Sequence, residues 1–326
     1  MLARAVIVAA MTLCLTLSAR GAGNYGEMAP EFPPGAFTDG QKYQLSDFAG
    51  KVVVLFFYEK DCPGCRRLIP QRNEVVRQYE GKPVKFFAVA AGDTLPQARS
   101  YAGSTRLAMP VFADSLSLME RRYGMSISLQ NIYQFRVIGP DGKVAGYRME
   151  PADIDKALQR VQLKYDPEQY HPRLRPALEM FEWNQHAAGM KLLRPMLNHA
   201  DAELAASANK LLESIKEEAN EWLSEADAAA EEDPLLAFDL YSKVSSALMP
   251  DELAKQAAEK ARKLQTHEQV KAELEARKMF ERVSGALAAA TPKPADAIKF
   301  AAEIVRKYPD TPTGQKAQAL QAELGG

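Results

Sequence analysis

Two cysteines that stand three positions apart carry the clearest chemical signal of the sequence. The chain of 326 residues has three cysteines, and two of them belong to the run Cys62-Pro63-Gly64-Cys65. At the start of a helix, the backbone amides and the helix dipole stabilise a thiolate on the first sulfur and lower its pKa. The second sulfur lies one turn away and can attack a mixed disulfide. The spacing therefore predicts thiol–disulfide exchange at this pair.

The segments around the pair predict a strand, a turn and a helix that would hold it in place. Residues 52–57 form a continuous β-branched and aromatic run, as expected for a strand buried on both faces. A short turn, residues 58–61, leads to the cysteines, and residues 65–79 can form one helix. A second buried strand is expected at residues 84–90. The order strand, helix, strand indicates an α/β unit.

Charged residues flank the pair on both sides. Lys60, Arg66 and Arg67 would favour a thiolate, and Asp61 would oppose it. Glu59 could relay protons, although an exposed turn position is the interpretation that we favour for it. The balance between these charges depends on distances that the sequence does not give.

The same cysteine spacing also forms half of a zinc site. A closed site needs two further ligands, but there is no second cysteine pair, and all four histidines lie beyond residue 165. We therefore predict neither a metal nor another cofactor. A redox-inert pair, kept for packing or as a local disulfide, remains open, although so short a loop gives a disulfide little to stabilise.

The first residues read as a targeting segment. Arg4 is followed by an uncharged apolar run, residues 5–17, and by small residues suited to cleavage, so residues 1–23 are predicted to be a signal peptide. The third cysteine, Cys14, would leave with this segment. No later stretch is apolar enough to cross a bilayer. We expect an exported protein, periplasmic or otherwise extracytoplasmic.

The rest of the chain divides into two parts. Residues 24–164 alternate short apolar runs with helical stretches, and a Gly-Pro-Asp-Gly turn at residues 139–142 predicts a β-hairpin. A closing helix is expected at residues 153–163. The formal net charge of −1 argues against a nucleic-acid partner, which would call for a basic excess. These features predict an α/β domain of its own at residues 24–164.

Residues 165–326 are rich in Ala, Leu, Glu and Lys and contain no strand-like run. Apolar residues recur at three- and four-residue steps from Leu204 to Ala226, which predicts one amphipathic helix. Three times in this region a short helix ends, a turn with Asp follows, and another helix begins, which indicates stacked helical hairpins. Trp183 and Trp222 stand at apolar positions and are expected to pack in the core of this helical half.

Taken together, the motifs of residues 28–163 resemble those of the thioredoxin superfamily, in particular the TlpA-like and AhpC/TSA-type redoxins. The matching pieces are Leu45-Ser46-Asp47-Phe48-Ala49-Gly50-Lys51, the cysteine run followed by Arg66 and Pro70, Met109 to Asp114, and Gly139 to Lys143. The resemblance implies a thioredoxin-like sheet of four or five strands flanked by helices. It also implies that Cys62 attacks, that Cys65 resolves the mixed disulfide, and that Pro70 kinks the helix.

The sequence departs from this family pattern at two positions. Asp61 stands where relatives usually carry Trp before the first cysteine. Relatives also place a cis-proline opposite the disulfide, and in this chain that position falls on about Tyr133. The cis-proline shapes the surface that grips a substrate backbone, so its absence predicts unusual substrate recognition. The changes at Asp61 and Tyr133 also favour an interaction scaffold built on a degenerate redoxin domain.

A peroxidase remains a second interpretation of the same residues. Pro63-Gly64-Cys65 resembles the peroxidatic segment of some peroxiredoxins, in which a Thr stands three residues before the reactive cysteine. Cys65 would then attack peroxide, Cys62 could resolve the sulfenic acid, and Arg136 would stabilise the thiolate. Cys62 in place of the Thr counts against this interpretation.

The segment around residues 304–312 resembles the helix-to-helix turn of tetratricopeptide-like proteins of the cell envelope. This resemblance implies an array of helical hairpins that offers a concave surface to a protein partner. Three functions stay open: an oxidoreductase whose helical domain chooses an exported client or redox partner, an interaction scaffold built on a degenerate redoxin domain, and a peroxidase. Both cysteines in their Arg66 and Pro70 context favour the first.

Overall fold

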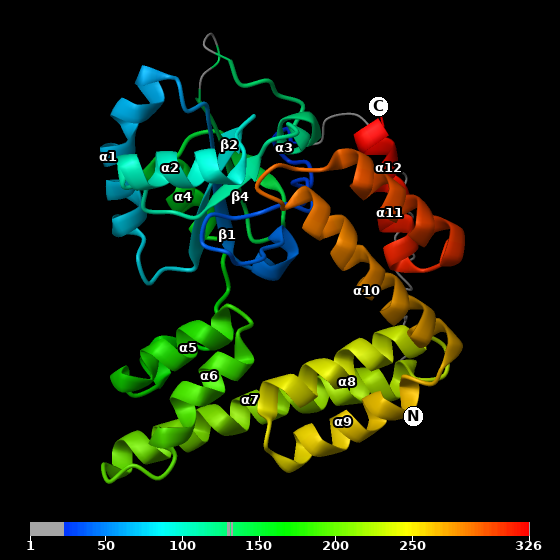
Figure 1. Ribbon diagram of the computed structural model, residues 1–326. Helices are drawn as coiled ribbons and strands as arrows, with labels where there is room; N and C mark the ends of the chain where they lie inside the picture. Colours follow the sequence, from blue (N-terminus) through cyan, green and yellow to red (C-terminus); the bar gives the residue numbers. More distant parts are fainter. Residues whose placement is uncertain (1–22, 129–130, 132, 326) are drawn as a thin grey trace, which may run out of the picture.

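The structure, a computed structural model, describes residues 23–128, 131 and 133–325. The signal peptide predicted for residues 1–23 therefore lies outside the described part of the chain, apart from its last residue. Figure 1 shows a sheet-bearing domain followed by a long helical region.

The domain is built on one five-stranded sheet with the order β3-β2-β1-β4-β5. Strand β1 pairs in parallel with β2, and β2 pairs in parallel with β3. On the other side, β4 runs antiparallel to β1, and β5 completes the predicted hairpin. The strands are β1 Val52–Tyr58, β2 Val84–Ala91, β3 Val111–Asp114, β4 Tyr133–Ile138 and β5 Val144–Gly146. This is the thioredoxin-like mixed sheet that the resemblance implied.

Every side chain of the central strand β1 is buried, which explains its continuous apolar sequence. Alternate residues point to opposite faces of the sheet. Val54, Phe56 and Tyr58 pack in the cluster that also contains both cysteines, whereas Leu55 and Phe57 pack in the cluster on the other face. The cysteine pair therefore belongs to one face of the sheet.

Helices cover both faces. Side chains of α1, α2 and α4 contribute to the core that contains the cysteines, and those of α3 contribute to the opposite core. The helices are α1 Pro63–Gln78, α2 Leu95–Thr105, α3 Leu118–Arg122 and α4 Pro151–Leu158. The closing helix begins earlier than the predicted 153–163, because Pro151 occupies the first helical position, where proline is favoured, and it ends earlier, at Leu158.

The second half of the described chain is helical. Its helices are α5 Arg175–Glu182, α6 His186–Leu193, α7 Ala202–Ala229, α8 Pro234–Leu248, α9 Glu252–Leu264, α10 Glu268–Leu287, α11 Pro294–Lys307 and α12 Pro312–Gly325. Helix α8 packs on α7 and α9, and α11 packs on α10 and α12. Asp201, Asp233 and Asp251 cap α7, α8 and α9, since each side chain accepts backbone N–H groups at the helix start. Of the three Asp turns predicted from the sequence, those before α7 and α9 are thus helix caps.

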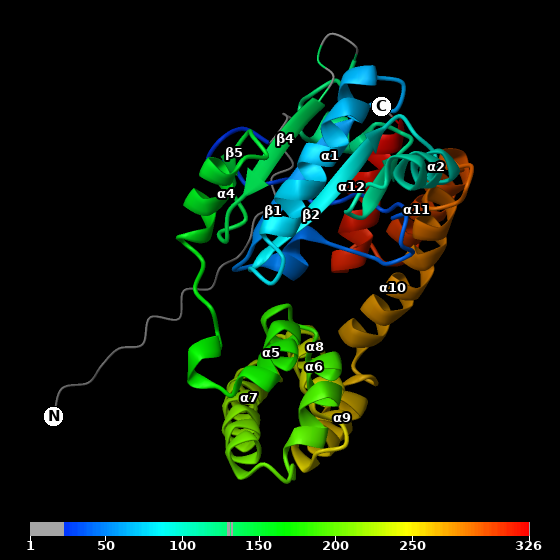
Figure 2. The same cartoon turned by 90° about the vertical axis from the view of Figure 1, so that its left-hand side faces the viewer.

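The helical region touches the sheet-bearing domain at both of its ends. In Figures 1 and 2, α5 lies directly below the sheet, and α10 leads back from the α7–α9 bundle so that α12 lies beside the domain. At the far end, Arg122 of α3 donates to both carboxylate oxygens of Glu323 in α12, at 2.9 and 2.7 Å. The chain therefore leaves the domain and returns to it.

Trp183 corrects one expectation from the sequence. It does not join the helical core but packs edge-on against Phe48 of the sheet-bearing domain, with ring centroids 5.8 Å apart. Trp222 does pack against the helical core. The apolar character of both positions was predicted, but the partner of Trp183 lies across the domain boundary.

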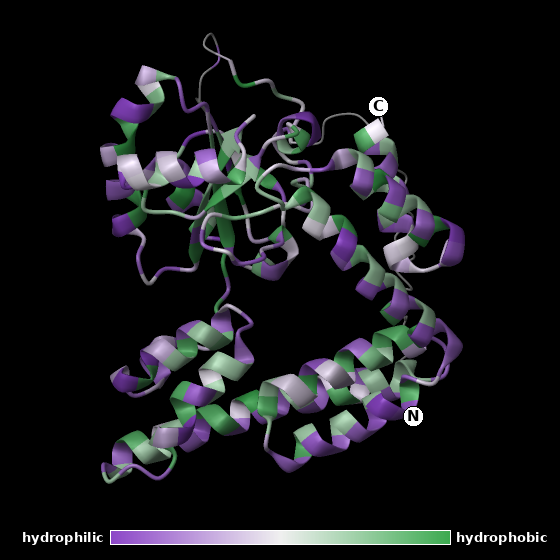
Figure 3. Cartoon of the chain, in the orientation of Figure 1, coloured by the Kyte–Doolittle hydropathy of each residue, from purple (hydrophilic) through white to green (hydrophobic). Residues whose placement is uncertain are grey.

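Hydropathy follows this architecture. Figure 3 shows green, hydrophobic strands in the centre of the domain, and helices of the second half that alternate between green and purple faces. No helix of the described residues combines the length and the apolar character that a membrane span needs.

Candidate active site

The turn after β1 places Cys62 at the start of α1. Cys62 is the N-cap residue, with an extended backbone, and Pro63 occupies the first helical position. Its Sγ accepts the backbone N–H of Cys65 at 3.1 Å. The helix therefore begins two residues earlier than predicted from the sequence, and its first turn directs a backbone donor at the Cys62 sulfur. Cys62 thus acts as a helix N-cap, whose side chain accepts a backbone N–H of the first turn.

Both sulfurs lie inside the protein. Cys62 is 1% exposed and Cys65 is 0% exposed, and the two are not joined in a disulfide. A cavity of about 550 Å³ reaches Cys62 from the surface between α1 and α2. It is lined by Lys60, Asp61, Cys62, Pro63, Arg66, Gln97, Ser100, Tyr101 and Ser104. A substrate sulfur would have to enter this cavity to meet Cys62.

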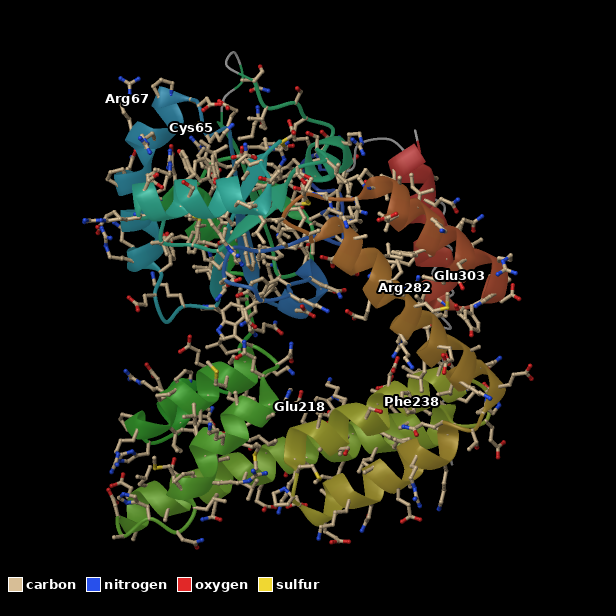
Figure 4. The ribbon with its side chains drawn as sticks, viewed as in Figure 1. Cys65, Arg67, Glu218, Phe238, Arg282 and Glu303 are labelled. Atoms are coloured by element: carbon tan, nitrogen blue, oxygen red, sulfur yellow. The ribbon has the colours of Figure 1, made fainter. Side chains whose placement is uncertain are left out.

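The two thiols differ in chemical environment. Burial raises the pKa of the Cys65 thiol to about 12; a backbone hydrogen bond from Glu59 opposes this, and the neighbouring Cys62 adds to it. Cys65 is therefore a neutral thiol near neutral pH. Figure 4 shows Cys65 near one end of α1, on the side of the domain away from the helical region.

The cations next to the pair are occupied by other partners. Lys60 Nζ lies 3.0 Å from a carboxylate oxygen of Asp61 and 3.3 Å from Oδ1 of Asp93. The guanidinium of Arg66 donates to Ser104 Oγ at 2.9 Å and lies over the ring of Tyr101. Arg67 is exposed at the outer side of α1 (Figure 4). Lys60 thus forms ion pairs with two carboxylates, and Arg66 contacts side chains of α2.

Pro70 and Tyr133, two of the predicted supporting residues, each lie in a regular secondary-structure element. Pro70 lies inside α1, which continues through it to Gln78. Tyr133 begins β4 and pairs in register with Tyr58, the last residue of β1. Among the described residues the single cis peptide bond is Met249–Pro250, in the helical region. The position where relatives carry a cis-proline therefore stands beside the strand end that leads to Cys62.

Arg136, which the peroxidase hypothesis placed beside Cys65, lies elsewhere. It pairs in register with Leu55, whose side chain belongs to the opposite face of the sheet. Its guanidinium donates to the carbonyl oxygens of Gly23 and Phe135, at 3.0 and 2.8 Å. The structure therefore does not bring this cation to the pair, because residue alternation in the strand turns it away.

A buried acid that contacts Lys60 was missed at the sequence level. Asp93 is 1% exposed, lies two residues after the end of β2 and has its Oδ1 3.3 Å from Lys60 Nζ. Burial raises the pKa of its carboxyl group, the charge of Lys60 opposes this, and Glu59 and Asp61 add to it. The ends of adjacent parallel strands meet at one edge of a sheet. The position of Asp93 just after the second predicted strand could therefore have indicated that it lies near the turn that follows the first strand.

Glu59 also differs from the expected exposed turn residue. It is only half-exposed, and its Oε2 is buried without a hydrogen-bond partner. Its other oxygen accepts the backbone N–H of Asp61 at 3.0 Å.

Within the described ranges, no group of three or more His, Cys, Asp or Glu side chains is arranged to hold a metal ion.

Comparison with known proteins gives similarities within the first half of the chain. The AhpC/TSA family matches residues 25–147. The thiol-disulfide oxidoreductase ResA of Bacillus thuringiensis subsp. konkukian is 32% identical over 120 residues, which are 36% of this chain and 67% of ResA. Peroxiredoxin prdx-2 of Caenorhabditis elegans is 32% identical over 118 residues, covering 31% of this chain and 54% of that protein.

Solved structures include similar folds. The crystal structure of a thiol:disulfide interchange protein of the thioredoxin family from Chlorobium tepidum TLS is 25% identical, covers 40% of this chain and 95% of its own, and has a TM-score of 0.34. The family match at residues 25–147 includes both cysteines and ends before the helical region.

Proposed function

Because the chain belongs to the AhpC/TSA family of the thioredoxin superfamily, we propose that it is an exported thiol–disulfide oxidoreductase that uses Cys62 and Cys65. The observation that carries this proposal is the hydrogen bond from the N–H of Cys65 to the Sγ of Cys62 at the first turn of α1. This contact supports Cys62, at the helix start, as the attacking sulfur and Cys65, one turn away, as the resolving one.

In the reducing direction, the reaction has two steps. The Cys62 thiolate attacks one sulfur of a client disulfide, the client S–S bond breaks, and the other client sulfur leaves as a thiolate. Cys65, deprotonated, then attacks Cys62 Sγ in the mixed disulfide and releases the second client thiolate. Two electrons have passed to the client, and a Cys62–Cys65 disulfide remains for an external thiol reductant.

The test is an equilibrium redox titration of the pair in the purified full chain, combined with trapping of the mixed disulfide. We expect a potential between about −120 and −270 mV, the range of known oxidoreductases. Cys65→Ser should accumulate a mixed disulfide on Cys62, and Cys62→Ser should not. A pair that resists reduction and traps nothing would leave an interaction scaffold, an alternative that the burial of both sulfurs favours.

Export is the second part of the proposal, and the pattern of residues 1–23 supports it. Intact mass spectrometry of the protein recovered from the extracytoplasmic fraction of the producing cell tests it directly. The expected mass is that of a chain that begins near residue 24. The uncleaved mass, or recovery only with the cytoplasm, would refute export without affecting the chemistry of the pair.

The helical region, residues 165–326, is proposed to bind the protein client. The exposed apolar side chains Leu192, Leu236 and Met249 lie in this region, and such side chains are favoured contacts in protein interfaces. Charged substitutions there, such as Met249→Glu, should lower the yield of the Cys65→Ser trap with the client. Unchanged reaction with a small chromogenic disulfide serves as the control. Equal trapping of the client by both proteins would contradict the proposal.

A further inference from the structure

A second cavity lies between the sheet-bearing domain and the last helices of the chain. It has a volume of about 610 Å³, and its walls come from the segments 32–37 and 42–44 of the domain and from α10 and α12. Figure 1 shows how α10 returns to the domain and places α12 beside it. Cavities of roughly 300–1,000 Å³ at boundaries between domains are common sites for small ligands. None of the residues that line it also lines the cavity at Cys62, so the two cavities are separate.

The inner wall of this cavity is aromatic. Phe32, Phe37 and Phe280 line it and are 6%, 4% and 8% exposed. Phe37 meets Phe32 and Tyr43 edge-on, with ring centroids 5.1 and 4.9 Å apart. Phe32 and Phe37 belong to the core on the sheet face opposite to the cysteines, whereas Phe280 belongs to the core of the last helices. Both parts of the chain therefore contribute to a preformed surface that suits a flat apolar body.

Gly285 leaves space in the same cavity. It lies within α10, and its backbone is not in the left-handed region that favours glycine. A Cβ atom at this position would meet no other atom within 4 Å. Glycine is a poor helix former compared with alanine. Neither the backbone conformation nor close packing requires glycine here, and its effect is to keep the cavity open.

Two of the three cations that line the cavity have carboxylate partners within the protein. Arg277 donates to the two carboxylate oxygens of Asp239, at 2.7 and 2.8 Å, and to Glu273 at 2.8 Å. Lys42 Nζ lies 2.7 Å from Glu281, which is the acid among the described lining residues. The charges of Arg277 and Lys42 are thus compensated, and a cationic ligand would find no unpaired carboxylate on these walls.

Lys316 of α12 is the third cation. Its Nζ lies over the ring of Phe280, 5.2 Å from the centroid, and it forms no ion pair with any residue that the structure describes. An ammonium group in this position can donate to a ligand carboxylate while the aromatic wall contacts the apolar body of the same ligand. The arrangement therefore favours an acid with an apolar ring.

We propose that this cavity binds a small aromatic carboxylate. The carboxylate accepts hydrogen bonds from Lys316 Nζ, and the ring of the ligand lies against Phe37 and Phe280 in the space beside Gly285. The proposal does not depend on the exchange activity of the cysteines, and its test uses binding alone.

Calorimetric titration of the full chain with naphthoate, and with the neutral analogue naphthamide, tests the role of the charge. Naphthoate should bind roughly tenfold more tightly than naphthamide, and Lys316→Gln should abolish this preference. Lys278→Gln is the matched control, because Lys278 is an exposed lysine of α10 that does not line the cavity. Equal affinity of the parent for the two compounds, or the same loss in both lysine variants, would overturn the proposal.

Gly285→Leu tests the location. Leucine fills the cavity at an exposed helical position and is the better helix former, so the thermal midpoint should stay the same or rise. Naphthoate binding should nevertheless weaken roughly tenfold or more. Gly103→Leu in α2 is its control, since a Cβ there also meets no atom within 4 Å and Gly103 does not line the cavity. Unchanged binding by Gly285→Leu, or no binding of naphthoate to the parent at about millimolar concentration, would show that the cavity is not such a site.

Discussion

Lys51 and Glu182 form a buried ion pair between the redoxin domain and the helical region, with Nζ and Oε2 2.6 Å apart and side chains 4% and 9% exposed. Lys51 directly precedes the central strand β1, and Glu182 is the last residue of α5. The second oxygen of Glu182 accepts the backbone N–H of Tyr165 at 2.7 Å. One carboxylate therefore fixes both the start of the central strand and the segment that connects the two parts.

Removal of one partner of this pair should be strongly destabilising. Lys51→Met leaves a carboxylate buried without its cation, and we expect a loss of about 3–5 kcal/mol in the free energy of unfolding. The double variant Lys51→Met/Glu182→Gln should lose less than the sum of the single changes. Urea unfolding followed by the fluorescence of Trp183, which lies at this boundary, measures the effect.

The exposed pair Lys42–Glu281 is the matched control, since it also joins the two parts of the chain but its side chains are 79% and 66% exposed. Lys42→Met should change stability by no more than about 1 kcal/mol. Similar losses for the two lysine variants, or additive losses at the buried pair, would contradict the role given to burial.

The pair of Arg122 and Glu323 should hold the last helix on the domain. Glu323→Gln removes the charge from a two-bond contact whose side chains are only 23% and 21% exposed. We expect faster amide hydrogen exchange in α12, which reflects a loss of about 1–3 kcal/mol in local stability. Glu74→Gln, at an exposed pair with Arg77, provides the control. Unchanged exchange in α12 would show that apolar packing alone holds this helix.

The sequence predicted elements whose signal is local, and it missed relationships that depend on tertiary structure. Strand β1 was predictable from its continuous apolar run and helix α7 from its apolar periodicity, because each pattern lies within a single element. The position of Cys62 at a helix start was also readable from its spacing and from Pro63. Asp93 and the pair of Lys51 with Glu182 were not, since no local pattern records which segments meet in three dimensions.

Glu218 predicts an acid-sensitive contribution to stability. Burial raises the pKa of its carboxyl group, but the nearby His186 imidazole, whose Nε2 lies 3.7 Å from Oε2, and hydrogen bonds from Lys164 and Tyr165 outweigh this and hold the pKa at about 2. Figure 4 shows Glu218 in the helical region. Its folded pKa lies below the ordinary value of 4.5, so the carboxylate stabilises the fold above that pH. This stabilisation is lost as the pH falls from about 4.5 to about 2.

Glu218→Gln should therefore be less stable than the parent at neutral pH, and the difference should decrease across that acid window. Chemical unfolding at a series of pH values measures it. The exposed neighbour Glu217 supplies the control, because Glu217→Gln should show no such convergence. A difference between parent and Glu218→Gln that stays constant with pH would mean that the side chain contributes by packing rather than by charge.

The last prediction concerns the reactivity of Cys65 itself. Burial raises the pKa of its thiol to about 12, and alkylating reagents react with the thiolate. In the Cys62→Ser variant, the rate of Cys65 alkylation should thus keep rising with pH, without the plateau near pH ~8.5 that an ordinary cysteine gives. Mass spectrometry of the labelled peptide measures the rate, and circular dichroism confirms the fold at each pH. The same variant unfolded in urea should show the ordinary plateau. A plateau near that value in the folded protein would place Cys65 in a solvated environment and would contradict the effect that burial is expected to have.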